Sequence, residues 1–179
     1  MGVPVIGIPG TIDNDISGTQ YTIGFDTAVQ TAIEAVDKIR DTAASSNRTF
    51  FIEVMGAKSS SIALKVGICT GAENVLLSDQ KVDHQKIADA IRRGIRRGKG
   101  SSIIIVAEGD KPGRSYDIAH ILKDLHDISS KVCVLGHIQR GGSPTSNDRF
   151  LGSVMGQMAI ETLMEGNTQN AIVVRDDRV

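Results

Sequence analysis

Short apolar runs alternate along this chain with segments in which apolar residues recur every three or four positions. The runs predict strands at residues 3–8, 49–55, 74–77, 102–107, 131–135 and 171–174. The helical spacing predicts helices at residues 22–42, 60–70, 82–98, 116–127 and 147–165. Strands alternating with helices predict an α/β fold, a three-layer αβα arrangement around a mainly parallel sheet. No internal repeat or linker interrupts the pattern, so residues 1–179 are predicted to form a single region.

The first run, at residues 3–8, is rich in β-branched residues and predicts a buried strand. The helix at 82–98 is predicted to bury Ile87, Ala88, Ile91 and Ile95 on one face. The densest charge cluster lies on the same helix and just beyond it, at Arg92, Arg93, Arg96, Arg97 and Lys99. Most such clusters are solvated helix faces, whereas basic side chains beside a Gly-rich turn can also bind an anion.

Composition narrows the possible functions. The formal charge is −1, from 20 basic and 21 acidic residues, and aromatic residues make up 3% with no Trp. This balance gives no support to nucleic-acid or membrane binding. The two cysteines, Cys69 and Cys133, form no CxxC pair and are expected to pack as small apolar residues. No apolar run is long enough to span a bilayer, so a soluble, cytoplasmic protein is the expectation.

Candidate chemistry begins directly after the first predicted strand. Pro9 and Gly10 end that strand, and Thr11, Asp13 and Asp15 follow on the turn. In open α/β sheets ligands bind at the carboxyl ends of strands. A carboxylate there could take a proton from a substrate alcohol or hold a metal-bound phosphate. The alternative is a plain turn, which Asx residues favour.

Two longer stretches carry a family resemblance. The sequence PGTIDND at 9–15, followed by GT at 18–19 and YTIGFDTA at 21–28, resembles the core signature of the bacterial-type phosphofructokinases. The sequence GHIQRGGSP at 136–144 matches a second signature of the same family. The resemblance runs over essentially all 179 residues and implies a phosphofructokinase-like fold. It also implies ATP-dependent phosphoryl transfer, with Mg²⁺, to the 1-hydroxyl of fructose 6-phosphate, a reaction of glycolysis.

The resemblance assigns roles to residues near the first signature. Asp13 matches the catalytic base that accepts the proton of the sugar 1-hydroxyl. Thr11 and Ile12 belong to the same sugar-contacting turn, and Thr11 is counted with Asp13 as catalytic. Asp15 matches a second acid near the metal and the phosphates, as a weak or outer ligand. The sugar-binding positions at the ends of later strands are Met55, Gly56, Ala57 and Glu108.

The second signature implies a phosphate anchor. His137 and Arg140 match the positions that hold the 6-phosphate, for which a bidentate guanidinium is well suited. Ile138 and Gln139 lie in the same substrate-binding segment. Arg48 and Lys131 match positions that reach into a neighbouring subunit's sugar site. The resemblance therefore implies a homo-oligomer, in the family usually a tetramer.

A further set of positions matches the family's allosteric nucleotide site, which lies between subunits. Each of its charged members alone would be an ordinary surface charge, and the sequence does not identify the effector. The matching residues are Arg40, Gly71, Ala72, Glu73, Arg97, Lys99, Gly100 and Ser101.

Five positions bear on how closely the family chemistry applies. Ala57 stands where the family has an Arg that stabilises charge on the moving phosphoryl group, and losing one such donor costs about a hundredfold or more in rate. Lys58 follows but lacks the forked guanidinium. Gln20 replaces a usual Asp, and Lys131 replaces a usual Arg. Gly10 stands where pyrophosphate-dependent relatives carry Lys, which favours ATP as the donor.

The resemblance also implies a partial phosphofructokinase domain. Its expected content is the catalytic turn and the sugar-phosphate part, without the family's N-terminal nucleotide loop and C-terminal end. An alternative is a non-catalytic sugar-phosphate-binding or subunit-interaction fragment, favoured by Ala57. A lipid kinase of the wider group is a weaker possibility, because the second signature suits a sugar phosphate.

Overall fold

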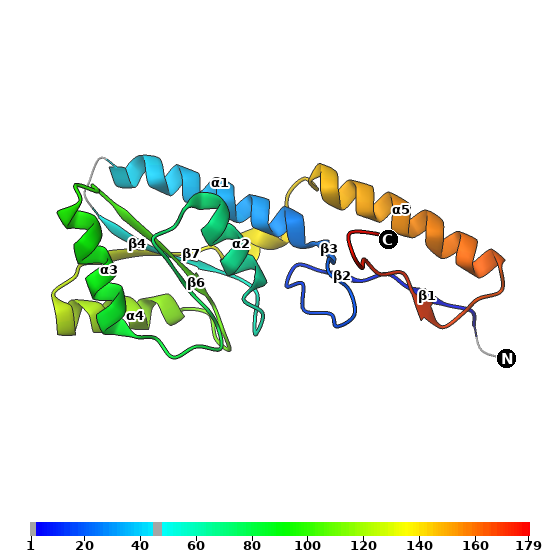
Figure 1. Ribbon diagram of the computed structural model, residues 1–179, viewed down its shortest axis with the longest axis horizontal. Coiled ribbons are helices and arrows are strands. Elements are labelled where there is room, and N and C mark those ends of the chain that lie inside the picture. Colours follow the sequence, from blue (N-terminus) through cyan, green and yellow to red (C-terminus); the bar gives the residue numbers. More distant parts are fainter. Residues whose placement is uncertain (1–2, 45–47) are drawn as a thin grey trace.

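The computed structural model describes residues 3–44 and 48–179. The elements follow the predicted alternation, with several short additions (Figure 1). They are β1 (Ile6–Gly7), β2 (Gly10–Thr11), β3 (Ile23–Gly24), α1 (Phe25–Ala44), β4 (Thr49–Val54), α2 (Ser61–Thr70), β5 (Asn74–Leu76), α3 (His84–Arg96), β6 (Ser102–Ala107), α4 (Arg114–His126), β7 (Ser130–Val134), the 3-10 helix η1 (Gly136–Arg140), α5 (Ser146–Met164) and β8 (Asn170–Ala171).

The main sheet has four parallel strands in the order β5-β6-β4-β7. Successive side chains on a strand point to opposite faces, so each central strand supplies two cores. Ile52 and Ile105 pack with helices α1 and α2 on one face, whereas Phe51 and Ile104 pack with α3 and α4 on the other (Figure 1). The predicted αβα layering around a parallel sheet is therefore confirmed.

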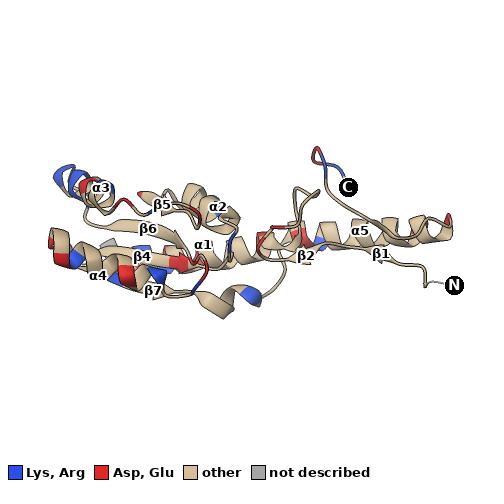
Figure 2. Cartoon of the chain, turned by 90° about the horizontal axis from the view of Figure 1, so that it is seen from below, with Lys and Arg blue, Asp and Glu red and all other residues tan. Residues whose placement is uncertain are grey.

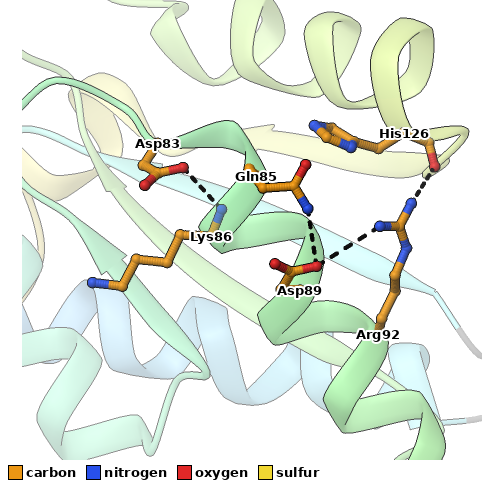
Figure 3. A network of polar contacts seen from close by, with 6 residues as sticks. All are labelled: Asp83, Gln85, Lys86, Asp89, Arg92 and His126. Atoms are coloured by element: carbon orange, nitrogen blue, oxygen red, sulfur yellow. Dashed lines mark hydrogen bonds and ion pairs between the residues drawn. The ribbon is translucent and has the colours of Figure 1, made fainter.

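Polar contacts join the two helices of the α3–α4 layer (Figure 3). Arg92 lies 3.8 Å from the Asp89 carboxylate and donates to the backbone oxygen of His126 at 3.1 Å. Asp83 caps α3 by accepting from the backbone N–H of Lys86 at 2.9 Å. These bonds fix the start of α3 and hold its middle against the end of α4.

The basic residues of α3 gather at its carboxyl end and are exposed (Figure 2). The exposure of these basic side chains agrees with the interpretation of the charge cluster as a solvated helix face. The predicted burial of Ile95 is wrong, because its side chain is 63% exposed. Each step of four residues turns a helix by about 40° beyond a full turn. Two such steps from Ile87 still leave Ile95 between Ile91 and Ala88 around the helix axis, so its exposure follows from its place in the last turn of α3, beyond the residues that pack in the second core.

A second, thinner part of the molecule is built on α5 (Figure 1). Its core joins Leu151 and Met155 of α5 to Ile172 and Val174 near the carboxyl terminus. Two short parallel ladders, β1 with β8 and β2 with β3, lie alongside. This part connects to the four-stranded sheet through α1 and the segment after η1.

The predicted buried strand at 3–8 is wrong in extent and in burial. Only Ile6–Gly7 forms β1, and Val3 is 80% exposed. The strand predicted at 171–174 likewise shrinks to β8, although Ile172 and Val174 are buried. Within the described residues β1 and β8 pair only with each other, so neither gains the two-sided cover of a central strand.

None of the helices formed by residues 3–44 and 48–179 combines the length and the apolar character that crossing a membrane requires.

Candidate active site

The turn that carries Asp13 is held rigidly between β2 and β3. Thr22 donates its hydroxyl to the backbone oxygen of Thr11 at 2.6 Å, and its N–H donates to Asn14 Oδ1 at 2.9 Å. The Asp13 N–H donates to Thr11 Oγ1 at 3.2 Å. Asn14 adopts a positive φ of 51°, which Asn tolerates better than most residues. These bonds hold the backbone of the turn on both sides of Asp13.

The Asp13 carboxylate is poorly satisfied. Its Oδ1 atom is buried and has no hydrogen-bond partner within the described residues. Burial raises the pKa of Asp13 above its ordinary value, the nearby Asp15 carboxylate raises it further, and Arg140 lowers it. The influence of Arg140 shows that the fold brings the two signatures together. An unpaired carboxylate of raised basicity is suited to accept a proton.

Arg140 ends the helix η1, which a buried amide holds in place. Gln139 is 1% exposed, its Oε1 accepts from Met55 N–H at 2.8 Å, and its Nε2 donates to the Ala28 carbonyl at 3.4 Å. The side chains of His137, Ile138 and Arg140 are exposed on either side of it. Gln139 therefore positions this segment through backbone contacts, while its neighbours are free to meet a ligand.

The residues after β4 and β6 meet at the carboxyl edge of the sheet. Glu108 Oε1 accepts from the Ala57 N–H at 3.2 Å. Gly56 has a φ of 142°, and a Cβ there would lie 2.7 Å from the Ser59 carbonyl oxygen, so the turn requires glycine. Ala57 has a φ of 45°, an unfavourable conformation for a residue with a Cβ. The turn therefore holds Ala57 beside Glu108 at a cost in strain.

Lys58 lies in different surroundings from Arg140. It lines a hollow of about 240 Å³ together with Ser78, Asp79, Gly109 and Asp110. Two of these neighbours are acidic. This placement gives Lys58 acidic neighbours of its own.

A larger cleft of about 530 Å³ lies beside Arg140. Ile12 also lines it, as do three residues that the sequence analysis did not select: Thr27, Asp148 and Arg149. Asp148 is the third residue after Thr145, the N-cap of α5. A Thr followed three positions later by an acid is a helix-start signal, and it could have identified this residue.

Arg48 and Lys131 lie at the opposite end of the sheet. Arg48 precedes β4, and Lys131 pairs with Phe50 near the start of the β4–β7 ladder. The chain therefore does not bring these two cations to His137 and Arg140. This is the placement expected of residues that serve a neighbouring subunit's site, which stays a prediction.

The predicted effector positions gather at the same amino edge. Glu73 pairs with Lys99 at 3.0 Å and accepts from the Ile103 N–H at 2.5 Å. Arg40 donates to the Thr70 carbonyl oxygen at 2.5 Å. The other predicted positions lie in the loops before β5 and β6: Gly71, Ala72, Arg97, Gly100 and Ser101. Their role as an effector site stays a prediction.

The described residues contain no group of three or more His, Cys, Asp or Glu side chains arranged to hold a metal ion. Mg²⁺ is commonly bound by one or two carboxylates together with substrate phosphates. The exposed Asp15, two residues beyond Asp13, fits such a partial ligand set.

A family model described as Phosphofructokinase matches residues 1–163. The chain belongs to the phosphofructokinase family. It is 53% identical over 165 residues to ATP-dependent 6-phosphofructokinase 1 of Thermus thermophilus, covering 92% of this chain and 51% of that protein. It is 50% identical over 178 residues to ATP-dependent 6-phosphofructokinase of Lysinibacillus sphaericus, covering 99% of this chain and 55% of that protein. This phosphofructokinase chain thus spans about half the length of these curated relatives.

Solved structures agree with the family and the fold. The phosphofructokinase of Saccharomyces cerevisiae superposes with a TM-score of 0.90 at 31% identity, over 98% of this chain and 24% of that chain. The match confirms the phosphofructokinase-like α/β fold, including the second part built on α5.

Proposed function

We propose that this phosphofructokinase chain supplies the base and the sugar-phosphate site for ATP-dependent phosphorylation of the 1-hydroxyl of fructose 6-phosphate, giving fructose 1,6-bisphosphate. The observation that carries the proposal is the unpaired, buried Asp13 Oδ1 within the electrostatic reach of Arg140. A base must lie within hydrogen-bond reach of the proton it takes, and an anchor must orient the substrate. The two signatures provide one of each.

The residues of the two signatures have different roles. Asp13 accepts the hydroxyl proton, and Thr11 and Ile12 shape the turn against the sugar. Arg140 and His137, exposed at the end of β7, bind the 6-phosphate by charge-assisted hydrogen bonds.

Groups at the ends of β4 and β6 complete the site for the sugar. Met55, Gly56 and Ala57 line it, and Glu108 accepts hydrogen bonds from sugar hydroxyls with the oxygen that Ala57 does not use. Asp15 would hold Mg²⁺, which would neutralise charge on the phosphates.

The relatives named ATP-dependent support ATP as the phosphate donor, as does Gly10. Arg48 and Lys131, remote from this site within one chain, complete the site of a neighbouring copy in a homo-oligomer. The amino-edge cluster around Glu73 binds an effector. A cytoplasmic location suits a glycolytic kinase, and residues 1–179 act as one region of the enzyme.

The proposal is tested in a chimera in which this segment replaces the matching half of a bacterial relative. Asp13→Ser should lower turnover by roughly a hundredfold to ten-thousandfold, the usual contribution of a general base. Fructose 6-phosphate affinity should change little, because the anchors are intact. A coupled assay of fructose 1,6-bisphosphate formation measures the first quantity and titration calorimetry the second.

Asp37→Ser, on the exposed face of α1, is the matched control and should behave as the parent chimera does. Near-parental turnover in Asp13→Ser would remove Asp13 from the mechanism. A chimera that binds fructose 6-phosphate but never turns over would support the non-catalytic binding alternative.

A further inference from the structure

The amino ends of the two longest helices, α1 and α5, meet beside the Arg140 cleft and cap each other. Asp148 of α5 is 4% exposed and accepts from the N–H groups of Gly24 and Thr27, each at 2.9 Å, and from the Thr27 hydroxyl. In return Thr145 donates its hydroxyl to Asp26 at 2.7 Å and its N–H to Thr27 Oγ1 at 3.2 Å. The Asp148 carboxylate thus satisfies N–H groups at the start of α1 while belonging to the first turn of α5.

This carboxylate lies between the two halves of the proposed site. Gly24, which donates to Asp148, pairs with Thr11 in the β2–β3 ladder, and Thr11 begins the Asp13 turn. On the other side, a loop of residues 141–145 leads from Arg140 to α5. A contact at Asp148 therefore links the base of the Asp13 turn to the segment that follows Arg140.

The remaining contacts of the Arg140 segment run elsewhere. Gln139 holds η1 to the body of α1 and to the end of β4. Arg149 Nε donates to the Pro144 carbonyl at 3.0 Å and fixes the loop to α5. Neither bond reaches β3 or the Asp13 turn. Asp148 makes the hydrogen bond to β3, next to the Thr145 bonds to the first turn of α1 and the packing of Ile23 against the core of α5.

We propose that Asp148 is a positioning residue that fixes the Asp13 turn relative to Arg140. The inference rests on the proposed function only in that these two side chains serve the substrate. Asp148 itself makes its contacts with the protein, so its effect on the reaction passes through the placement of the other two.

The chain offers a closely matched control in Glu53. This carboxylate is 1% exposed and accepts from two N–H groups and one hydroxyl, those of Gly113 (2.6 Å) and Ser115 (2.7 and 2.6 Å). The donor set is the same as that of Asp148, and it too lies at a helix amino end. Glu53 joins β4 to α4, however, and does not connect the Asp13 turn with Arg140.

The experiment compares Asp148→Asn with Glu53→Gln in the 179-residue chain. Each amide leaves at least one former donor without its acceptor, so both variants should melt at lower temperature than the parent. Residual dipolar couplings of the backbone amides report the orientation of residues 10–24 and α5 relative to the main sheet. Only Asp148→Asn should change these couplings. It alone should also weaken fructose 6-phosphate binding, by about threefold to tenfold in titration calorimetry.

Thr27→Val keeps the side-chain shape and removes one of the three donors to Asp148, so it decides the question if Asp148→Asn does not fold. It should change the dipolar couplings and weaken fructose 6-phosphate binding as Asp148→Asn does, but by less. Parental couplings and affinity in the folded Asp148 variant, or an equal affinity loss in Glu53→Gln, would overturn the proposal. If the parent chain binds no fructose 6-phosphate, the proposed function is challenged, and the dipolar couplings still decide whether Asp148 orients the turn.

Discussion

Charged residues at the two edges of the main sheet have different hydrogen-bond surroundings. At the carboxyl edge, Asp13 keeps a buried oxygen without a partner in the described part of the chain, and Ala57 adopts a left-handed conformation. At the amino edge, Glu73 is paired with Lys99 and with the Ile103 N–H, and Arg40 bonds a carbonyl oxygen. The amino edge has a left-handed residue, Asp127, and a buried hydroxyl without a partner, Ser130 Oγ, so what sets the carboxyl edge apart is a carboxylate oxygen without a partner in the described part of the chain.

This contrast has a physical consequence for ligand binding. Unpaired buried polar groups and strained residues destabilise a fold and commonly mark functional sites. A ligand at the carboxyl edge gains interactions that the protein does not already make. A ligand at the amino edge must compete with the bonds of Glu73 and Arg40, so binding there would be coupled to their rearrangement.

A large change in turnover that would sharpen this contrast is expected at Ala57. Ala57→Arg should raise turnover of the chimera by about tenfold to a hundredfold, because it places a fixed cation beside the transferring phosphate. The side chain is exposed, so an arginine has room. The neutral Ala57→Gln variant is the control and should leave turnover unchanged. Unchanged turnover in Ala57→Arg would mean that another cation already stabilises the transferring phosphate.

Arg140→Ala tests the phosphate anchor of the carboxyl edge. Loss of charge-assisted hydrogen bonds should weaken fructose 6-phosphate binding by about 1.5–3 kcal/mol. It should also raise the pKa of Asp13, because Arg140 lowers it in the parent chain. Calorimetry and carboxyl-carbon NMR titration measure these two changes. Arg93→Ala, on the exposed face of α3, should produce neither, and unchanged affinity in Arg140→Ala would rule out the anchor.

At the amino edge the two partners of one ion pair should differ in their effect on stability. Glu73→Ala should lower the free energy of unfolding by about 1–3 kcal/mol, because it leaves the Ile103 N–H without its acceptor. Lys99→Ala should cost less than about 1 kcal/mol, since this lysine is largely exposed. Chemical denaturation of both variants measures the difference. Equal losses would show that the ion pair, and not the backbone bond, dominates.

The smallest effect concerns the stability of the Asp13 turn against pH. The pKa of Asp13 is raised in the folded chain, so the native state keeps a proton that the unfolded state has lost in the window between the ordinary and raised values. Stability from this group therefore falls as pH rises through that window and is constant above it. Asp13→Asn has no carboxylate at this position, so its free energy of unfolding lacks this pH-dependent decrease. The difference in free energy of unfolding between Asp13→Asn and the parent should therefore increase across the window and stay constant above it. Parallel denaturation curves at every pH would contradict the raised pKa.

Much of the fold follows from local sequence. Runs such as residues 102–107 and the helical spacing of α1 and α5 predicted the alternating elements, because hydrophobic periodicity records which face of an element is buried. The family was accessible for a related reason. The two signature stretches are contiguous, so their resemblance is visible without knowing where they lie in space.

The tertiary structure alone decided which groups meet. Asp13 and Arg140 are separated by most of the chain, and only the packing of η1 and α5 against the start of α1 brings them together. Burial of Gln139 and Asp148, like the exposure of Val3, depends on neighbours supplied by distant segments. Periodicity is a local property, whereas burial and hydrogen-bond satisfaction are set by contacts remote in sequence, so the sequence named most of the candidate residues and the fold determined how they are arranged.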